Sequence, residues 1–335
     1  MPAFPIPGRR SLSFSQTSSV PRGYRELFQL AGPIVLSRLG VMAMGLTDAV
    51  IVGRHSATEL GFHSLGWAPT MTVLVAALGL LLGVLVMTAR HLGAGQPERT
   101  GAVLRRGIAY ALKIGLASTV VLAAAGPVVL RHLGLDPALA AGAARPLVVF
   151  SLSLTPYLVA DCLWLWLEGH GRASVPTAAM WAANLLNLGL GLWLIPGNSP
   201  FPVEGAVAAA WVTLAARTAL MLMLGIYVWR WPRARALGVF APAPPDRALA
   251  AEQRRIGYAS GLSYGIEAGS FASLNFVAAQ LGATVVAGWA IVMNLASILF
   301  MVPLGVAAPP ACSSPALPAP GTRKACAWRS DVASG

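Results

Sequence analysis

Residues 27–52 read LFQLAGPIVLSRLGVMAMGLTDAVIV, and this stretch decides what class of protein the chain belongs to. A helix needs about 20 apolar residues, at 1.5 Å each, to cross a bilayer, and this stretch is long enough. It nevertheless contains Arg38 and Asp48. A charge inside a membrane span costs roughly 2.5–3.5 kcal/mol on insertion scales and seldom persists there without a use or a partner. We therefore expect residues 27–52 to form a membrane helix that carries part of the function.

The composition of the whole chain indicates the same class. Of 335 residues, 56% are hydrophobic and 11% are charged, and the mean hydropathy is +0.67. Soluble domains have about 25% charged residues, so a polytopic membrane protein is predicted. The net charge of +12 does not indicate a nucleic-acid partner, because the arginines lie between apolar runs rather than on a soluble face.

Seven further apolar runs follow the first, which predicts an all-α fold with about eight transmembrane helices. These runs cover residues 65–89, 108–130, 146–167, 173–196, 203–229, 256–281 and 285–308.

The chain divides into two unequal lobes at its longest polar connection. We expect a six-helix N-lobe at residues 24–230, a flexible cytoplasmic linker at 231–255, and two helices of a second lobe at 256–308. Residues 1–23 are predicted to be a disordered cytoplasmic N-terminus, and 309–335 a disordered tail. Residues 52–67 weakly resemble 279–294, as expected if the two lobes are repeats, which is common in secondary transporters.

The arginines predict the orientation of the chain in the membrane. If the N-terminus is cytoplasmic, fifteen arginines of the N-terminus and the loops up to residue 255 lie inside, whereas only Arg54, Arg131 and Arg145 lie outside. Positive residues are enriched in cytoplasmic loops, so we expect a multi-pass protein of the inner (plasma) membrane with its N-terminus in the cytoplasm.

Several motifs occur in the order and spacing of a known family. They are GLTDAVIVGR (45–54), HLGAGQPERTGAVLRRG (91–107), LWLEGHGRASVPTAAMWAANLLNLGLGLWLI (165–195), FPVEGAVAAAWVT (201–213), GLSYGIEAG (261–269) and ILFMVPLGVA (298–307). Together they resemble the MATE (multidrug and toxic compound extrusion) transporters, in particular the NorM-like branch. The resemblance implies a cation-coupled antiporter that exports amphipathic organic cations, with H⁺ or Na⁺ as the coupling ion and no other cofactor or metal. It ends after residue 308, so we expect a chain that is truncated or frameshifted after the eighth helix.

Two acidic residues are candidates for cation coupling. Asp48 lies in the last third of the first span, and Glu267 lies centrally in the seventh. Carboxyl groups within a span are functional candidates by default, although packing or a wet interface could also explain Asp48. The family resemblance favours coupling at both positions.

Other polar residues within the spans have structural explanations as well. Asp161 and Arg217 are expected to form a buried pair with each other, with an internal cavity as the competing use. Asn184, Asn187 and Asn275 either support a cation site or join neighbouring helices. Some family members carry an aspartate one turn after an asparagine of the fifth helix. Here Leu188 and Gly191 occupy those places, which disfavours a multi-oxygen sodium site and favours a proton at Asp48. Arg38 lies ten residues from Asp48, on another face of the helix, and is left without a role.

Other functions remain as alternatives. A lipid-linked oligosaccharide flippase of the same superfamily would carry more cations in its cavity than Arg38 and Arg217. A non-functional remnant that only inserts into the membrane is the non-transport alternative. Enzyme motifs such as HExxH, GxSxG and the P-loop are absent from the sequence, so we do not expect an enzyme. GLTD and YGIE also do not resemble the active site of an intramembrane aspartyl protease.

Overall fold

The computed structural model describes residues 24–132, 134, 137–197, 200–241, 247–280 and 292, and the regular elements of this part are all helices. The predicted all-α fold class is therefore confirmed. The elements are α1 (Tyr24–His55), α2 (Ala57–Gly93), η1 (Pro97–Arg99), α3 (Thr100–His132), α4 (Pro137–Leu152), α5 (Leu154–Gly169), α6 (Ser174–Leu194), α7 (Gly205–Arg230), η2 (Pro232–Ala234) and α8 (Arg247–Gln280).

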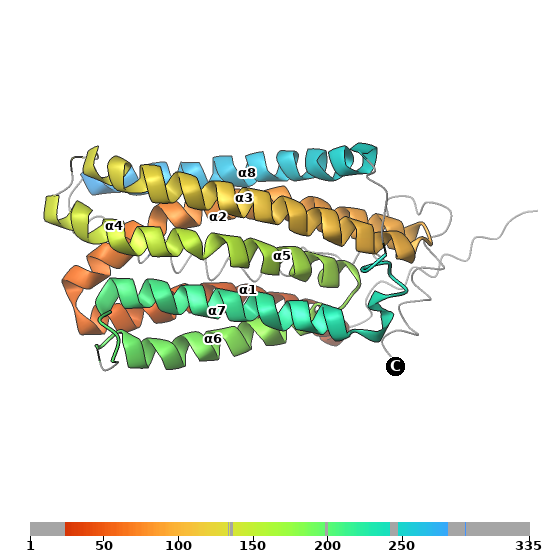
Figure 1. The fold of residues 1–335 in the computed structure, drawn as a ribbon, viewed down its shortest axis with the longest axis horizontal. Coiled ribbons are helices and arrows are strands. Elements are labelled where there is room, and N and C mark those ends of the chain that lie inside the picture. The colour runs from red at the N-terminus through yellow and green to blue at the C-terminus, as the bar shows by residue number, and fades with distance from the viewer. Residues whose placement is uncertain are drawn as a thin grey trace, which may run out of the picture.

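The long helices lie side by side along the long axis of the molecule and form an elongated bundle (Figure 1). Among the described residues, five segments are long and apolar enough to cross a membrane. They are Ala57–Gly93, Pro97–His132, Pro137–Gly169, Ser174–Leu194 and Gly205–Arg230. Seven of the eight predicted spans coincide with described helices, counting α4 and α5 together. The segments predicted at 1–23 and 309–335 lie outside the described residues, as does nearly all of 285–308.

The fourth span is divided into α4 and α5 at Ser153. The backbone N–H of Ser153 bonds to the carbonyl of Phe150 at 3.0 Å, which is a tighter turn than an α-helix makes. Pro156 has no N–H to donate to the carbonyl of Leu152, so the regular ladder is interrupted there. The break leaves the Ser153 hydroxyl inside the bundle, where it is fully buried.

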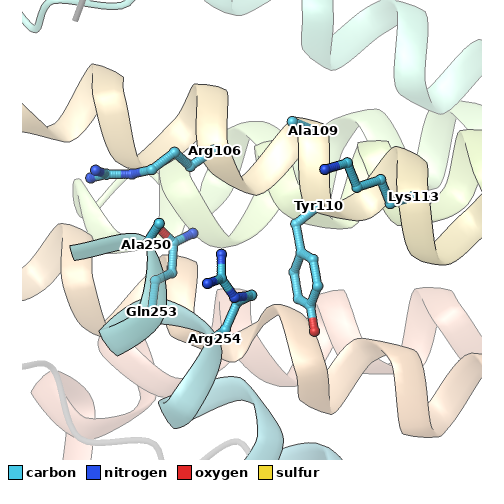
Figure 2. A pocket seen from close by; sticks show the side chains of 7 residues that line it. All are labelled: Arg106, Ala109, Tyr110, Lys113, Ala250, Gln253 and Arg254. Carbon is cyan, nitrogen blue, oxygen red and sulfur yellow. The ribbon is translucent and has the colours of Figure 1, made fainter. Parts of the chain in front are cut away.

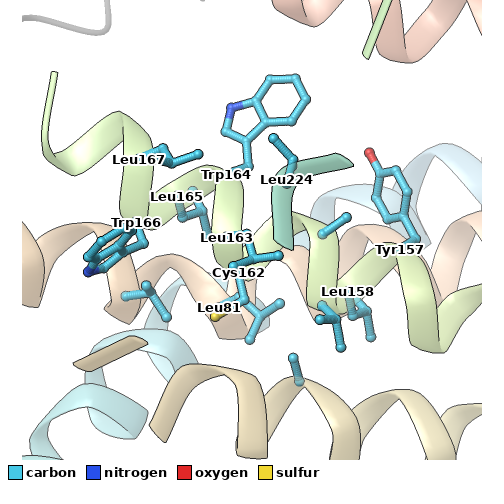
Figure 3. Packing of buried hydrophobic residues seen from close by; sticks show 14 of the residues in the cluster. Leu81, Tyr157, Leu158, Cys162, Leu163, Trp164, Leu165, Trp166, Leu167 and Leu224 are labelled. Atoms are coloured by element: carbon cyan, nitrogen blue, oxygen red, sulfur yellow. The ribbon is translucent and has the colours of Figure 1, made fainter. Parts of the chain in front are cut away.

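Helix α5 forms the centre of the core. Leu158, Trp166 and Leu167 on this helix are 0% exposed, and Figure 3 shows them packed among leucines of neighbouring helices. The indole N–H of Trp166 donates to the carbonyl of Thr100 at 3.0 Å, so this large apolar side chain has its polar atom satisfied. The apolar layer around α5 joins the helices of the first lobe.

Helices α2 and α8 approach each other through glycines. Gly79 on α2 faces Gly261 on α8, and a Cβ atom added to Gly79 would lie only 2.6 Å from the Cα of Gly261. Gly83 and Gly257, one turn away on each helix, likewise face the backbone of the partner helix. Small residues allow membrane helices to pack closely, so this contact fixes α8 against the first lobe.

The connection between α7 and α8 differs from the predicted flexible linker at 231–255. Trp231, Leu237 and Val239 are buried, and the N–H of Gly101 donates to the carbonyl of Leu237 at 2.8 Å. The Arg105 guanidinium donates to the carbonyls of Gly238 and Val239. Residues 231–241 are therefore packed on the start of α3, and α8 begins at Arg247, nine residues before the predicted position. The prediction weighed Pro and Arg content and overlooked the apolar residues within the connection.

Helix α1 begins at Tyr24 and α7 ends at Arg230, which are the bounds predicted for the N-lobe. The division into two lobes stays a prediction, because the residues compared as a repeat, 279–294, lie almost entirely outside the described part.

Candidate functional site

Asp48 of α1 is enclosed in the first lobe. Its side chain is 1% exposed, and the Thr213 hydroxyl of α7 donates a hydrogen bond of 2.6 Å to its Oδ2. The other carboxylate oxygen, Oδ1, is buried and has no hydrogen-bond partner. A buried polar atom without a partner costs about 1–3 kcal/mol, so the structure keeps an unused acceptor at this position.

Asn187 of α6 faces the same carboxylate. It is 0% exposed and lies close enough to interact with Asp48, but neither its Oδ1 nor its Nδ2 makes a direct hydrogen bond. Two adjacent side chains thus keep unsatisfied polar atoms within an apolar bundle. A proton, a small cation or a bridging water between them would satisfy these atoms.

Arg217, one helical turn after Thr213 on α7, is the buried cation of this region. It is 3% exposed, and its Nη1 donates to the Ser153 hydroxyl at 2.7 Å. Its guanidinium carbon lies 4.7 Å from the ring centre of Tyr157 and 5.1 Å from that of Trp67. Arg217 also interacts electrostatically with Asp48, without an ion-pair contact. The break at Ser153 therefore supplies a hydroxyl that holds the guanidinium.

The predicted pair of Asp161 with Arg217 is not among the contacts that the structure describes for Arg217, and it stays a prediction. Ser153, Tyr157 and Asp161 follow at four-residue steps on the inner side of the same span, and Arg217 contacts the first two of them. Asp161 lies eight residues beyond Ser153, a rise of about 12 Å along a helix. Arg217 lies near the middle of α7, whereas Asp161 lies eight residues before the end of the span Pro137–Gly169.

Asn184 and Asn187 have different surroundings although they are one turn apart. The Nδ2 of Asn184 donates to the carbonyl of Gly40 on α1 at 2.8 Å. Gly40 is itself in close contact, because an added Cβ would lie 2.8 Å from the Cγ of Met180. Asn184 therefore joins α6 to α1, whereas Asn187 faces Asp48.

Glu267 lies elsewhere, on α8, and its side chain is exposed among the described residues. Helix α8 packs mainly on α2, whereas Asp48 is enclosed by α1, α6 and α7. The structure thus does not bring the two predicted coupling acids together. The role of Glu267 in cation coupling stays a prediction. The side chains of Arg38 and Asn275 lie outside what the structure describes.

Aromatic side chains pack beside the Asp48 cluster, by which we mean Asp48, Asn187, Thr213 and Arg217. These aromatic contacts were not predicted from the sequence. Trp67 of α2 lies between the Arg217 guanidinium and the Phe150 ring, with ring centres 5.1 Å apart in the Trp67–Phe150 pair. His63, one turn before Trp67, packs edge-on against Phe150 at 5.4 Å and is 3% exposed.

Sequence reasoning also missed Thr213, Ser153 and Tyr157. A signal existed, since Thr213 and Arg217 are four residues apart on α7, as are Ser153 and Tyr157 across the α4–α5 break. Polar residues at this spacing share one face of a helix. The spacing does not show which side chains of other helices these polar faces contact.

Comparisons with known proteins bear on this arrangement. The protein-family model described as MatE matches residues 33–193. A protein of Caulobacter vibrioides described as "Probable multidrug resistance protein NorM" is 51% identical over 282 residues, covering 84% of this chain and 60% of that protein. The "Multidrug resistance protein PmpM" of Pseudomonas aeruginosa is 28% identical over 300 residues, covering 89% of this chain and 63% of that protein.

The fold also matches a solved structure, that of a multidrug resistance MATE family transporter of the MOP superfamily in an outward-facing conformation. The TM-score is 0.75 at 20% sequence identity, with 92% of this chain and 65% of that chain covered. At this identity the likeness shows the fold alone. The chain spans less than two thirds of the length of each of these proteins.

Proposed function

Because this chain belongs to the MATE family, a family of multi-pass membrane transporters rather than enzymes, we propose that it forms part of a cation-coupled efflux antiporter in which Asp48 carries the coupling ion. The observation that supports this most is the enclosed carboxyl itself. Asp48 is 1% exposed, is bonded to Thr213 through one oxygen, and keeps its other oxygen unpartnered near Asn187.

The cluster offers favourable contacts to both protonation states of Asp48. When the carboxyl is ionised, the Thr213 hydroxyl donates to it and the charge of Arg217 offsets its own. When it is protonated at Oδ1, the new O–H needs an acceptor, and the Oδ1 of Asn187 is available. A group that is accommodated in both states can bind and release a proton during a transport cycle.

A proton fits the cluster better than a sodium ion. Asp48 supplies the only carboxylate among Asp48, Asn187 and Thr213. A proton neutralises it at one oxygen, whereas a sodium ion needs several oxygen ligands arranged around it. The positions one turn after Asn184 and Asn187 are Leu188 and Gly191, neither of which adds a side-chain oxygen. We therefore assign H⁺ as the coupling ion of this lobe.

The proposed transport cycle has two states, one open to the cytoplasm and one open to the outside. Alternating access moves one bundle against the other around a site near the middle of the membrane. A proton drives this exchange only by the difference in its affinity for the two states, so the contacts of Asp48 must change between them. The relatives are named as multidrug resistance proteins, which supports drug-like compounds as cargo, and we propose amphipathic cations among them. Glu267 is the proposed second coupling group, completed by residues beyond the described part.

The proposed orientation places the N-terminus in the cytoplasm. The start of α3, the end of α7 and the start of α8 lie at the same end of the bundle (Figure 1). This end carries Arg99, Arg105, Arg230, Arg233 and Arg247. Positive residues favour the cytoplasmic side of a membrane protein.

Ethidium export from a drug-sensitive bacterial host tests the proposal. Cells that express the 335-residue chain should extrude ethidium, and Asp48→Asn should abolish the extrusion, because the amide has nearly the same shape but cannot ionise. Glu252→Gln is the matched control, since Glu252 is a partly exposed acid outside the cluster. Equal export by wild type and Asp48→Asn would contradict the role of Asp48. A lack of export from the wild type at normal expression would favour a membrane-inserted remnant.

A further inference from the structure

A groove between α3 and α8 is not explained by the transport proposal. Both helices pack on α2 and leave a space between them of about 190 Å³ near the arginine-rich end of the bundle. Helix α3 lines it with Arg106, Ala109, Tyr110 and Lys113, as Figure 2 shows. The small side chain of Ala109, and that of Ala250 on α8, leave this space unfilled.

The lining of the groove is cationic. Arg106 and Lys113 lie on one face of α3, because seven residues make nearly two turns. Arg254 reaches into the groove from α8, where Figure 2 shows its guanidinium beside the Tyr110 ring. None of the seven lining residues is acidic. Glu252, close by in the sequence, forms an ion pair with Arg90, which does not line the groove. Arginine and lysine in such an arrangement suit a phosphate group.

A buried amide adds a second recognition element. Gln253 lines the groove and is only 6% exposed. Its Nε2 donates to the carbonyl of Val103 at 3.5 Å, and its Oε1 is buried without a hydrogen-bond partner. This oxygen can only accept, and the Gln253 side chain must turn toward the groove before a hydroxyl or N–H donor of a ligand reaches it.

The surface beyond the groove is apolar and exposed. Leu116 and Val120 continue the face of Lys113 along α3 and are 57% and 66% exposed. Tyr258 and Leu262 on α8, 55% and 67% exposed, continue the face of Arg254. In a multi-pass membrane protein such side chains face lipid acyl chains. A ligand that joins an anionic head to acyl chains would therefore match both parts of the surface.

We propose that the groove between α3 and α8 binds an anionic phospholipid with a glycerol headgroup. The phosphate lies among Arg106, Lys113 and Arg254, a headgroup hydroxyl donates to the Oε1 of Gln253, and the acyl chains run along the exposed faces of α3 and α8. Basic pockets between membrane helices on the cytoplasmic side bind such headgroups in other proteins. The site does not depend on transport activity, so its test measures lipid binding and not export.

Lipid titration of the purified 335-residue chain, followed by native mass spectrometry, tests the site. Phosphatidylglycerol should bind more tightly than phosphatidylcholine. Arg254→Gln should weaken phosphatidylglycerol binding about fivefold, the amount expected for one cation near an anionic lipid. Arg255→Gln is the matched control, because Arg255 is also exposed on α8 but does not line the groove, and its affinity should stay within twofold of wild type.

Two further arms separate the pocket from general electrostatics and from soluble anions. Ala250→Leu fills the groove without changing the charge and should also weaken binding. Glycerol 3-phosphate has the headgroup chemistry without acyl chains and should not displace the lipid at equal concentration. Equal losses in Arg254→Gln and Arg255→Gln, no preference for phosphatidylglycerol, or displacement by glycerol 3-phosphate would each overturn the proposal. Because Arg254 and Arg255 are both exposed, a folding defect does not account for a difference between them.

Discussion

Two carboxyl groups of the same protein have opposite surroundings. Asp48 is enclosed by three helices and is 1% exposed, whereas Glu267 lies on an exposed face of α8. The Asp48 cluster draws all its described contacts from the first lobe, through Thr213, Asn187 and Arg217. Helix α8 is instead fixed by its glycine contacts with α2.

The difference shows what each group requires. A carboxyl that faces lipid is costly, so the face of α8 with Glu267 must meet water or further protein in the membrane. Asp48 already has its hydrogen-bond donor and a compensating charge within residues 24–230. The first lobe therefore contains a complete proton site in our account, whereas the site at Glu267 depends on residues outside the described part.

The largest effect on stability is expected from a substitution that forces α8, which carries Glu267, away from α2 of the first lobe. Gly79→Ala places a methyl group 2.6 Å from the Cα of Gly261, so α2 and α8 must move apart. We expect a loss of about 3 kcal/mol in the free energy of unfolding, at the upper end for overpacking. Gly189→Ala is the control, since its added Cβ has no neighbour within 4 Å. Thermal unfolding in detergent measures both, and equal stability of the two variants would contradict the close contact.

A smaller effect is expected inside the enclosed region. Thr213→Val has nearly the shape of threonine but removes the hydroxyl that donates to Asp48. The buried carboxylate loses its donor, which should cost about 2 kcal/mol and reduce export. Thr213→Ser keeps the hydroxyl and should retain most of the stability. The thermal unfolding midpoints of Thr213→Val and Thr213→Ser measure the contribution of this hydrogen bond. Identical midpoints would show that the hydrogen bond contributes nothing to stability.

A third variant separates the two asparagines of α6. Asn184→Ala removes the hydrogen bond to the carbonyl of Gly40 and should lower stability by about 1 kcal/mol, the usual scale between membrane helices. Asn187→Ala removes no direct hydrogen bond and should leave stability nearly unchanged while it impairs export. The reverse pattern, with Asn187→Ala the less stable of the two, would refute this division of roles.

The smallest effect on stability is expected at the exposed ion pair between α2 and α8. Arg90 and Glu252 form an ion pair whose side chains are 63% and 34% exposed. Exposed pairs contribute about 0–1 kcal/mol, so Glu252→Gln should change stability by less than about 0.5 kcal/mol. A larger loss in the same unfolding assay would mean that charge, rather than glycine packing, holds α8 in place.

Much of the fold follows from the sequence because hydropathy directly determines which segments cross a membrane. The runs at 65–89 and 108–130 lie inside α2 and α3. Such patterns depend on the local sequence alone. The linker prediction weighed the Pro and Arg content of residues 231–255 as a whole, whereas Trp231 and Leu237 within it are buried.

The candidate site could be predicted only in part. Asp48 and Asn187 were chosen separately, and no feature of the sequence places α1 beside α6 and α7. The Asp161–Arg217 prediction compared positions within the spans but not depth along the bundle. Arg217 meets Ser153, which became available through a helix break caused by Pro156. Which residues meet across helices depends on packing angles and offsets that single-span patterns do not contain.

Proton release by the purified protein on addition of ethidium tests the role of Asp48 most directly. In a weakly buffered solution with a pH-indicator dye, the wild type and the control Glu252→Gln should release protons as ethidium binds, because both retain the enclosed carboxyl and Glu252 lies outside the site. Asp48→Asn should still bind ethidium, seen by fluorescence anisotropy, but release none. Proton release from Asp48→Asn equal to that of the wild type would contradict the account.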